Sequence, residues 1–406
     1  MDSGQNREGQ GDIVFRREKL DQASAIMNEL DLDLWLTFVR ESETTKDPSL
    51  DVLVGANVTW QSAFMVTRQG RRVAIVGSLD KTRIERSGTF PEVRGYVGGI
   101  SSELLSMLGE LDPARIALNY SLDTELADGL THGMYLLLQN ILKGTPYGER
   151  FVSSERLVAA LRGRKTPSEV DRIRRACQAT VAIFGELTER LKVGLTEKQV
   201  AAIITERMES RGLEPAWEAI QCPAVFTGPG SAGAHAGPTD TPIESGHIMN
   251  VDFGVKVDGY CSDLQRTWYF RRKGEDKAPK EVQRGFDTIR DAVHKAADAL
   301  RPGKMGWEID AIARSHIVEA GYEEYPHALG HQVGRVAHDG RALLCPHWER
   351  YGDRGDQPIE EGQVYTIEPR LTVPGFGIAT IEEIVWVRSD GVEFLSDPQM
   401  ELIEVG

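Results

Sequence analysis

The pattern of apolar and polar positions changes about 160 residues into the chain. Before that point, stretches with apolar residues at helical spacing alternate with short apolar runs such as "LWLTFV" and "VAIVG", which are typical of buried strands. This alternation predicts an α/β layer domain over residues 12–160. The polar start "MDSGQNREGQGD" has no apolar core, so we expect a disordered tail at residues 1–11 and no secretory signal.

The second part of the chain has a different order of elements. The motif "KTPSE" offers a helix N-cap, a proline and an acidic first turn, which together start a helix. Two long helical stretches follow, then strands and turns over 222–270, helices over 281–300 and 307–320, and a strand-rich segment over 362–403. The pattern predicts an α+β domain around an antiparallel sheet over residues 161–406.

Length and composition narrow the range of functions. The chain has 406 residues, more than the roughly 250–300 that a single core accommodates, which also indicates two domains. Its net charge of -15 argues against a nucleic-acid partner, and no apolar run approaches the ~20 residues of a membrane span. Four scattered cysteines without a CxxC pair indicate neither a disulfide framework nor a thiolate zinc site. We therefore expect a cytoplasmic protein without a membrane partner.

Two aspartates lie on a predicted hairpin in "NVDFGVKVDGYCSDL". If Asp258-Gly259 is a two-residue type I′ turn, Asp252 lies opposite Gln265. Asp263 is two residues from Gln265, so it shares the face of Asp252. Two like charges on an apolar strand pair are unfavourable unless a proton or a cation lies between them.

A similar arrangement recurs downstream. The segment "QVYTIEP" ends near Glu368, "RLTVPGFG" forms a turn, and "IATIEEIVWV" returns with Glu382. A loop centred on Gly375 places Glu368 and Glu382 directly opposite each other. We interpret Asp258 of the first hairpin as a turn former and Glu383 of the second as a solvent-facing neighbour.

Three histidines, His327, His331 and His338, cluster between the two hairpins in "PHALGHQVGRVAHDG". Four carboxylates and about one imidazole suit an oxygen-rich site for Mn²⁺, with Co²⁺ or Zn²⁺ as alternatives. This number of ligands suits two metal ions, which could hold a bridging hydroxide and polarise a carbonyl. The chemistry indicated is metal-assisted hydrolysis.

These motifs resemble those of the pita-bread metallopeptidases, which comprise methionine aminopeptidase, Xaa-Pro aminopeptidase and prolidase, with creatinase as a metal-free relative. The resemblance lies in two aspartates separated by ten residues, in "GHQVG", in "TIEP" and in "TIEE". It implies a C-terminal pita-bread fold. It also implies five metal ligands: Asp252, Asp263, His331, Glu368 and Glu382.

The resemblance further implies catalytic and substrate-binding roles. Glu368 would take the proton from the nucleophile. His338 and His235 would stabilise the oxyanion or orient the substrate. His327, four residues before His331, would contact the substrate.

The first 160 residues resemble the creatinase-type N-terminal domain in length and in their α/β alternation. This domain accompanies the proline-specific branches, so the resemblance implies Xaa-Pro bonds as substrates, in a dipeptide or short peptide, and a homodimer. We predict a prolidase, that is, an Xaa-Pro dipeptidase. An Xaa-Pro aminopeptidase acting on longer peptides and a metal-free, non-catalytic peptide-binding relative are the alternatives.

Several residues depart from the family pattern. Arg370 replaces a glycine, Thr372 stands where the family has tyrosine, and Thr380 where it has arginine. Arg335 is a further arginine that the family pattern lacks. Since a guanidinium can bind a carboxylate through two hydrogen bonds, we expect Arg370 and Arg335 to contact the free carboxylate of a dipeptide. The alternative is that both pair with surface carboxylates.

Overall fold

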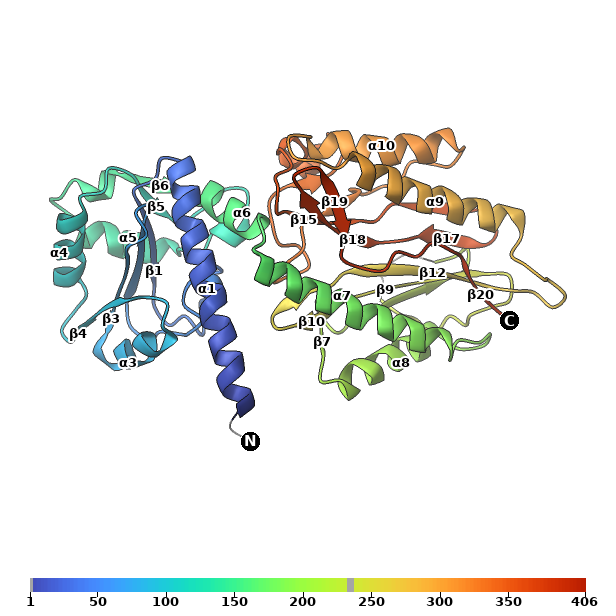
Figure 1. The fold of residues 1–406 in the computed structure, drawn as a ribbon, viewed down its shortest axis with the longest axis horizontal. Coiled ribbons are helices and arrows are strands. Elements are labelled where there is room, and N and C mark those ends of the chain that lie inside the picture. Colours follow the sequence, from blue (N-terminus) through green and yellow to red (C-terminus); the bar gives the residue numbers. More distant parts are fainter. Residues whose placement is uncertain (1–2, 232–236) are drawn as a thin grey trace. The chain divides into compact units, whose positions relative to one another are not determined.

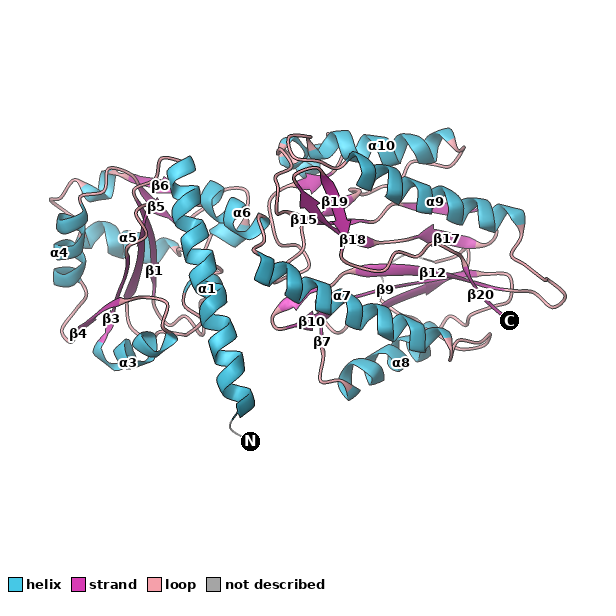
Figure 2. Cartoon of the chain, viewed as in Figure 1, coloured by secondary structure: helices cyan, strands magenta, loops and turns pink. Residues whose placement is uncertain are grey.

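The computed structural model describes residues 3–231 and 237–406, with only the backbone for residues 3–12 (Figure 1). The chain divides into two compact units, Met1–Arg162 and Gly163–Gly406. Each unit combines helices with β-strands (Figure 2).

The first unit is built on one six-stranded sheet. Its strand order is β4 (Glu92–Tyr96), β3 (Arg72–Gly77), β2 (Ser62–Thr67), β1 (Leu34–Val39), β5 (Ile116–Leu118) and β6 (Phe151–Ser153). Strand β2 is antiparallel to both of its neighbours, and the other pairs are parallel.

Helices cover both faces of this sheet (Figure 1). Apolar side chains of α4 (Ser101–Leu111) and α5 (His132–Ile141), such as Leu104 and Leu138, pack on Leu34 and Leu36 of β1. Helix α1 (Ser3–Glu29) lies along the opposite face. The layered α/β arrangement predicted from the alternating pattern is confirmed. The remaining helices are α2 (Leu50–Leu53), α3 (Ser78–Ser87), α6 (Glu155–Gly163) and the 3₁₀ turns η1 (Glu125–Ala127) and η2 (Tyr147–Glu149).

Helix α1 begins within the stretch 1–11, for which the sequence predicts a disordered tail. The helix is assigned from Ser3. No proline interrupts this polar stretch, so its backbone can continue the helical turns that the apolar residues after position 12 anchor.

The second unit contains mostly antiparallel strands in several small sheets. The largest has the order β20 (Ile403–Val405), β12 (Leu264–Phe270), β9 (Ile248–Phe253) and β8 (Ala224–Thr227). A second has the order β15 (Val364–Ile367), β18 (Glu383–Arg388) and β19 (Gly391–Phe394), next to the hairpin of β16 (Arg370–Val373) and β17 (Gly377–Thr380). Short strands complete the unit: β11 (Tyr260–Cys261), β10 (Val255–Val257) and β7 (Glu214–Pro215) in one sheet, β13 (Gly330–His331) and β14 (Leu343–Leu344) in another.

Two helix pairs flank these strands. Figure 1 shows α9 (Lys280–Ala299) and α10 (Gly306–Glu319) along one side, and α7 (Pro167–Thr188) and α8 (Glu197–Ser210) along the other. The helices predicted over 281–300 and 307–320 are confirmed to within one residue. The 3₁₀ turns η4 (Glu349–Tyr351) and η5 (Arg354–Asp356) lie in the connection before β15.

Helix α7 begins as the "KTPSE" motif predicts. Thr166 is the N-cap, its hydroxyl accepts from the Glu169 N–H, and the Glu169 carboxylate accepts from the Thr166 N–H. Glu169 also accepts a hydrogen bond from the Tyr260 hydroxyl over 2.9 Å. The cap therefore ties the helix to the hairpin that carries Asp252 and Asp263.

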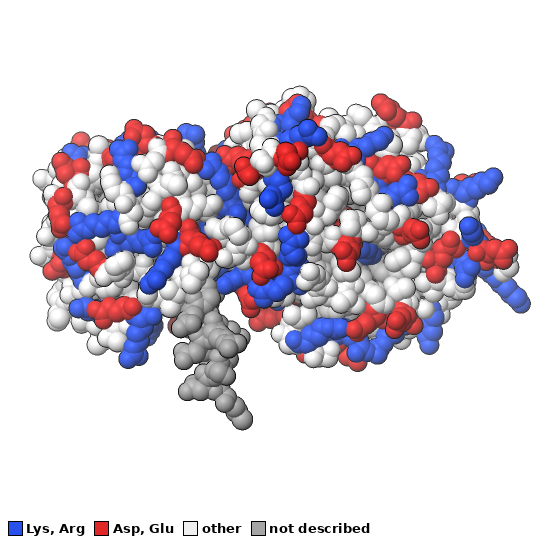
Figure 3. Space-filling view, in the orientation of Figure 1, with Lys and Arg blue, Asp and Glu red and all other residues white. Residues whose placement is uncertain are grey.

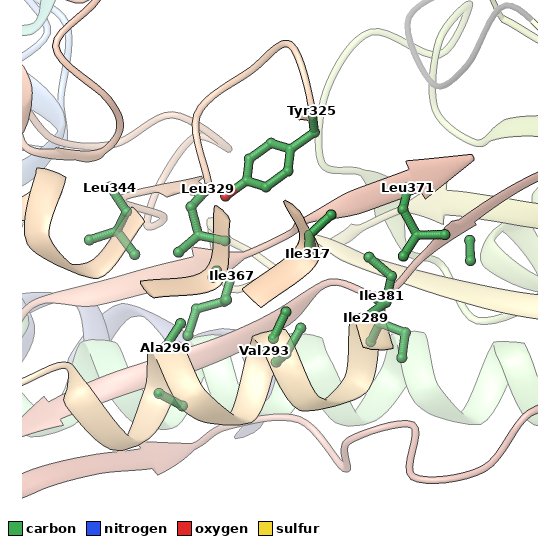
Figure 4. Close-up of a cluster of buried hydrophobic side chains, with 14 of the residues drawn as sticks. Ile289, Val293, Ala296, Ile317, Tyr325, Leu329, Leu344, Ile367, Leu371 and Ile381 are labelled. Atoms are coloured by element: carbon green, nitrogen blue, oxygen red, sulfur yellow. The ribbon is translucent and has the colours of Figure 1, made fainter. Parts of the chain in front are cut away.

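An apolar core lies between α9, α10 and the strands β15 to β18 (Figure 4). Leu371, Ala379 and Ile381 belong to this core. Because side chains alternate between the two faces of a strand, Arg370 and Thr380 lie on the opposite face. This alternation separates the structural face of the hairpin from the face that is available for chemistry.

Basic and acidic side chains are mixed over the described residues of the face drawn in Figure 3. No continuous basic stripe of the kind that binds nucleic acid is visible there. Within the part of the chain that the structure describes, no helix has both the length and the apolar composition needed to cross a membrane.

Candidate metal centre

The first hairpin has the predicted register. Strands β9 and β12 pair antiparallel with Asp252 opposite Gln265. At the turn, Asp258 has φ +49° and Gly259 has φ +76°, as a type I′ turn requires. The interpretation of Asp258 as a turn former is confirmed.

The second hairpin also has the predicted register. Arg370 lies opposite Thr380 in β16 and β17, and Ile367 lies opposite Glu383 in β15 and β18. Extending either strand pairing toward the other places Glu368 opposite Glu382. Glu368 and Glu382 therefore face each other between the two strand pairs, as the sequence predicts.

His331 reaches the carboxylates from strand β13. A Cβ added at Gly330 would overlap the carbonyl oxygen of Thr366, so glycine allows β13 to approach β15 closely. The Thr366 hydroxyl also accepts from the His331 N–H over 3.1 Å. Nδ1 of His331 is 3.3 Å from the Gln332 carbonyl oxygen, which leaves Nε2 for the site.

Donor atoms from three distant segments meet at one point. One ligand atom each from Asp263, His331 and Glu382 lies within 4.8 Å of the others. Nε2 of His331 is 3.7 Å from Asp263 Oδ2 and 3.3 Å from Glu368 Oε1. Asp263, His331 and Glu382 are buried, whereas Asp252 and Glu368 are partly exposed. The cluster is therefore partly accessible.

The four carboxyl groups perturb one another. Burial raises the pKa of Asp252 to about 7. Burial raises the pKa of Asp263, Glu368 and Glu382 well above the usual range, and the charge of Asp252 raises all three further. A cation held between them would relieve both effects.

The protein atoms leave two carboxylate oxygens without a partner. Within the described residues, Asp252 Oδ1 and Glu382 Oε1 are buried and make no hydrogen bond. Buried acceptors of this kind are rare in proteins unless an ion or water satisfies them. Oxygen-rich donors with one imidazole fit a divalent cation such as Mn²⁺, Co²⁺ or Zn²⁺.

His331 is suited to be the nitrogen donor. Burial, followed by the charge of His338, lowers the pKa of His331 to about 3. The imidazole is therefore neutral near pH 7 and offers a lone pair at Nε2.

Gln265, which sequence reasoning did not assign to the site, holds its carboxylates, and Thr380 in turn holds Gln265. Nε2 of Gln265 donates to Glu382 Oε2 over 2.9 Å and lies 3.5 Å from Glu368 Oε2. The Thr380 hydroxyl donates to Gln265 Oε1 over 3.1 Å. The hairpin register already placed Gln265 opposite Asp252, which is the signal that could have identified it.

The interpretation of Glu383 as solvent-facing is wrong. Its side chain is fully buried and lies 2.9 Å from the Arg266 guanidinium. The Ser396 hydroxyl and the Gln399 N–H also donate to its carboxylate. Residues 396–399 fold over β18 at this point, so strand alternation alone does not expose Glu383.

The other three histidines that the sequence predicts for the site, His338, His327 and His235, differ in position. The His338 ring packs edge-on against the His331 ring, with centroids 4.3 Å apart. His327 lies 2.8 Å from the Ala328 carbonyl through Nδ1, and its ring packs on Tyr325. His235 lies outside the described residues.

The two arginines that depart from the family pattern differ in their contacts and burial. The Arg335 guanidinium lies over the Tyr260 ring, 5.4 Å from its centroid. Arg370 is half-buried, and burial lowers its pKa. No hydrogen bond or ion pair of the Arg370 guanidinium occurs within the described residues.

Comparisons with known proteins agree with this geometry. The sequence pattern of metallopeptidase family M24 matches residues 171–389, more than half of the chain, so the protein belongs to this family and is a metallopeptidase. It is 32% identical over 276 residues to the Xaa-Pro dipeptidase of Pyrococcus furiosus, covering 66% of this chain and 73% of the relative. Over 261 residues it is 31% identical to the Xaa-Pro dipeptidase of Pyrococcus horikoshii, covering 63% and 68%.

Solved structures show the same fold. The Xaa-Pro dipeptidase from Bacillus anthracis superposes with a TM-score of 0.73 at 24% identity, covering 96% of this chain and all of that one. The X-Pro aminopeptidase from Thermotoga maritima gives a TM-score of 0.72 at 24% identity, covering 93% and 99%. The predicted pita-bread fold, preceded by a creatinase-type α/β domain, is confirmed.

Proposed function

We propose that this metallopeptidase hydrolyses the Xaa-Pro bond of dipeptides. The observation that carries the proposal is the convergence of Asp263, His331 and Glu382 next to the partnerless oxygen of Asp252. The names of the Pyrococcus relatives support the Xaa-Pro specificity.

Five residues would hold two divalent ions, for which Mn²⁺ fits the oxygen-rich donors well and Co²⁺ or Zn²⁺ are alternatives. When bound, such ions activate water near neutral pH and polarise the scissile carbonyl. The five residues are Asp252, Asp263, His331, Glu368 and Glu382.

Glu368 has the position of a general base. Its carboxylate is partly exposed, 3.3 Å from His331 Nε2, and the Thr366 hydroxyl lies 3.4 Å from Oε1. Glu368 would take a proton from the attacking water on one oxygen and release it toward the leaving proline nitrogen.

The histidines would bind and orient the substrate. His338, next to His331, would donate to the oxyanion that develops on the scissile carbonyl. His327 would contact the substrate from the loop before β13. The role of His235 rests on the family resemblance alone.

We also propose a cytoplasmic homodimer. All four cysteines are buried and free, which agrees with a reducing compartment. The dimer rests on the resemblance of the first unit to the creatinase-type domain.

Substrate length separates the candidate activities. The metal-loaded protein is assayed with Ala-Pro, Ala-Pro-Ala and, as a control for proline specificity, Ala-Ala. We expect Ala-Pro alone to be cleaved. Cleavage of Ala-Pro-Ala with equal or greater efficiency would favour an Xaa-Pro aminopeptidase, and binding without turnover would favour a non-catalytic relative.

A further inference from the structure

Arg370 lies on the same face of the second hairpin as the carboxylate cluster. It is directly opposite Thr380 in the β16–β17 ladder, and opposing residues of an antiparallel pair share a face. The Thr380 hydroxyl donates to Gln265, which donates to Glu382. The Arg370 side chain therefore starts from the side of the strands where the carboxylates converge.

The packing of the apolar core independently indicates the same orientation for the Arg370 side chain. Leu371 and Val373 pack against α9 beside Gly285, where an added Cβ would lie 2.5 Å from Val373. Alternation then directs Arg370 and Thr372 away from α9. Thr372 is exposed, so the face opens to solvent just beyond Arg370.

Arg370 differs from the buried Arg266 and Arg314 of this unit in having no carboxylate partner among the described residues. Arg266 pairs with Glu383 at 2.9 Å, and Arg314 pairs with Asp310 at 2.6 Å. Within the described residues, the half-buried Arg370 guanidinium makes no such contact. A partly desolvated, unpaired cation is unfavourable, so this position is suited to an anion from outside the chain.

We propose that Arg370 binds the C-terminal carboxylate of the dipeptide and thereby restricts the substrate to two residues. This inference rests on the proposed function. Arg370 begins β16 two residues after Glu368, a span of up to about 6.6 Å for an extended backbone, and the carboxylate of an Xaa-Pro dipeptide lies one residue beyond the scissile bond. The guanidinium can bind it through two parallel hydrogen bonds. A longer peptide would place an uncharged amide there.

The test compares Ala-Pro with its C-terminal amide in the metal-loaded protein. Arg370→Met removes the charge and keeps most of the side-chain volume, whereas Arg370→Lys keeps the charge without the planar fork. Arg388→Met is the matched control, because Arg388 lies in the neighbouring sheet, is exposed and pairs with Glu393.

We expect the wild-type protein to favour the free acid over the amide. Arg370→Met should raise KM for Ala-Pro about 10- to 100-fold, the range expected for a charged hydrogen bond, and leave the amide nearly unaffected. Arg370→Lys should lie in between, and Arg388→Met should match the wild type. The acid-to-amide ratio would not change if Arg370 only supported the fold.

Two results would overturn the inference, and they are distinguishable. If the wild-type protein cleaves acid and amide equally and Arg370→Met keeps both rates, Arg370 does not bind the carboxylate while the proposed function stands. If the metal-loaded wild-type protein cleaves neither compound, the proposed function fails and the inference with it.

Discussion

Gln265 donates a hydrogen bond from Nε2 to Glu382 Oε2 over 2.9 Å, and this contact joins the two carboxylate hairpins. The two residues are 117 positions apart in the sequence. Gln265 also lies 3.5 Å from Glu368, so one amide orients a carboxylate from each arm of the second hairpin. The geometry of the candidate metal centre therefore depends on a residue that offers it no ligand.

Removing this amide should weaken metal binding without removing a ligand. We expect Gln265→Ala to lower the affinity for Mn²⁺ about 10- to 100-fold, as for other residues that orient metal ligands. Calorimetric titration of the chelator-stripped protein measures the change. Gln283→Ala is the control, because Gln283 lies on α9 and its side chain bonds Asp287 of the same helix. An affinity equal to that of the wild type would show that Glu382 needs no support from Gln265.

Substitution of Glu383 should affect mainly the stability of the fold, whereas substitution of the adjacent Glu382 should affect mainly metal binding. Glu383 pairs with Arg266 inside the protein, so Glu383→Ala should lower the free energy of unfolding by about 3–5 kcal/mol. Glu382→Gln removes one of several repelling carboxylates, so it should change the stability of the metal-free protein by less than about 1 kcal/mol. It should nevertheless abolish tight metal binding. Urea unfolding in the presence of chelator separates the two effects, and equal destabilisation by both variants would contradict the assignment.

The stability of the metal-free protein should fall as the pH rises. The pKa of Asp252 is raised from 3.8 to about 7 in the folded protein. The protonated group therefore contributes stability fully below about pH 4, and this contribution is lost as the pH rises through about 7. Asp263, Glu368 and Glu382 shift in the same direction.

Binding of a divalent metal should restore the stability that is lost when the carboxyl groups of the site ionise. With Mn²⁺ at a hundred times its Kd, we expect Tm to rise by about 5–10 °C at pH 8 and very little at pH 5. Differential scanning calorimetry with and without chelator measures this, and Asp252→Asn should reduce the pH dependence. An equal metal effect at pH 5 and pH 8 would argue against carboxylate ligands.

The close approach of β13 to β15 should require glycine at position 330. Gly330→Ala places a Cβ against the Thr366 carbonyl, and such overpacking should reduce stability by about 1–3 kcal/mol. It should also displace His331 and weaken metal binding. Gly391→Ala is the control, since no atom of the described residues lies within 4 Å of its added Cβ. Unchanged metal affinity in Gly330→Ala would mean that His331 is placed by other contacts.

Turn chemistry made much of the site predictable from sequence. Asp258-Gly259 allows two consecutive positive φ angles, and this fixes the register that places Asp252 opposite Gln265. In the second hairpin, Gly375 has φ +79°, and the register on both sides agrees with Glu368 opposite Glu382. Local rules of this kind are readable from a single sequence.

Contacts between distant segments were not predictable in the same way. The burial of Glu383 depends on residues 396–399, whose polar sequence gives no sign that they cover β18. The role of Gln265 depends on how closely the two hairpins approach. Likewise, the sequence offered Arg335 and Arg370 as equivalent candidates, and only the packing of Arg335 on Tyr260 distinguishes them.

The most direct test of the account follows Ala-Pro hydrolysis while chelator-stripped protein is titrated with Mn²⁺. The account predicts no turnover without metal, and a rate that rises with added metal and levels off near two equivalents. Full activity in the stripped protein, or none with any divalent ion despite correct folding, would contradict it.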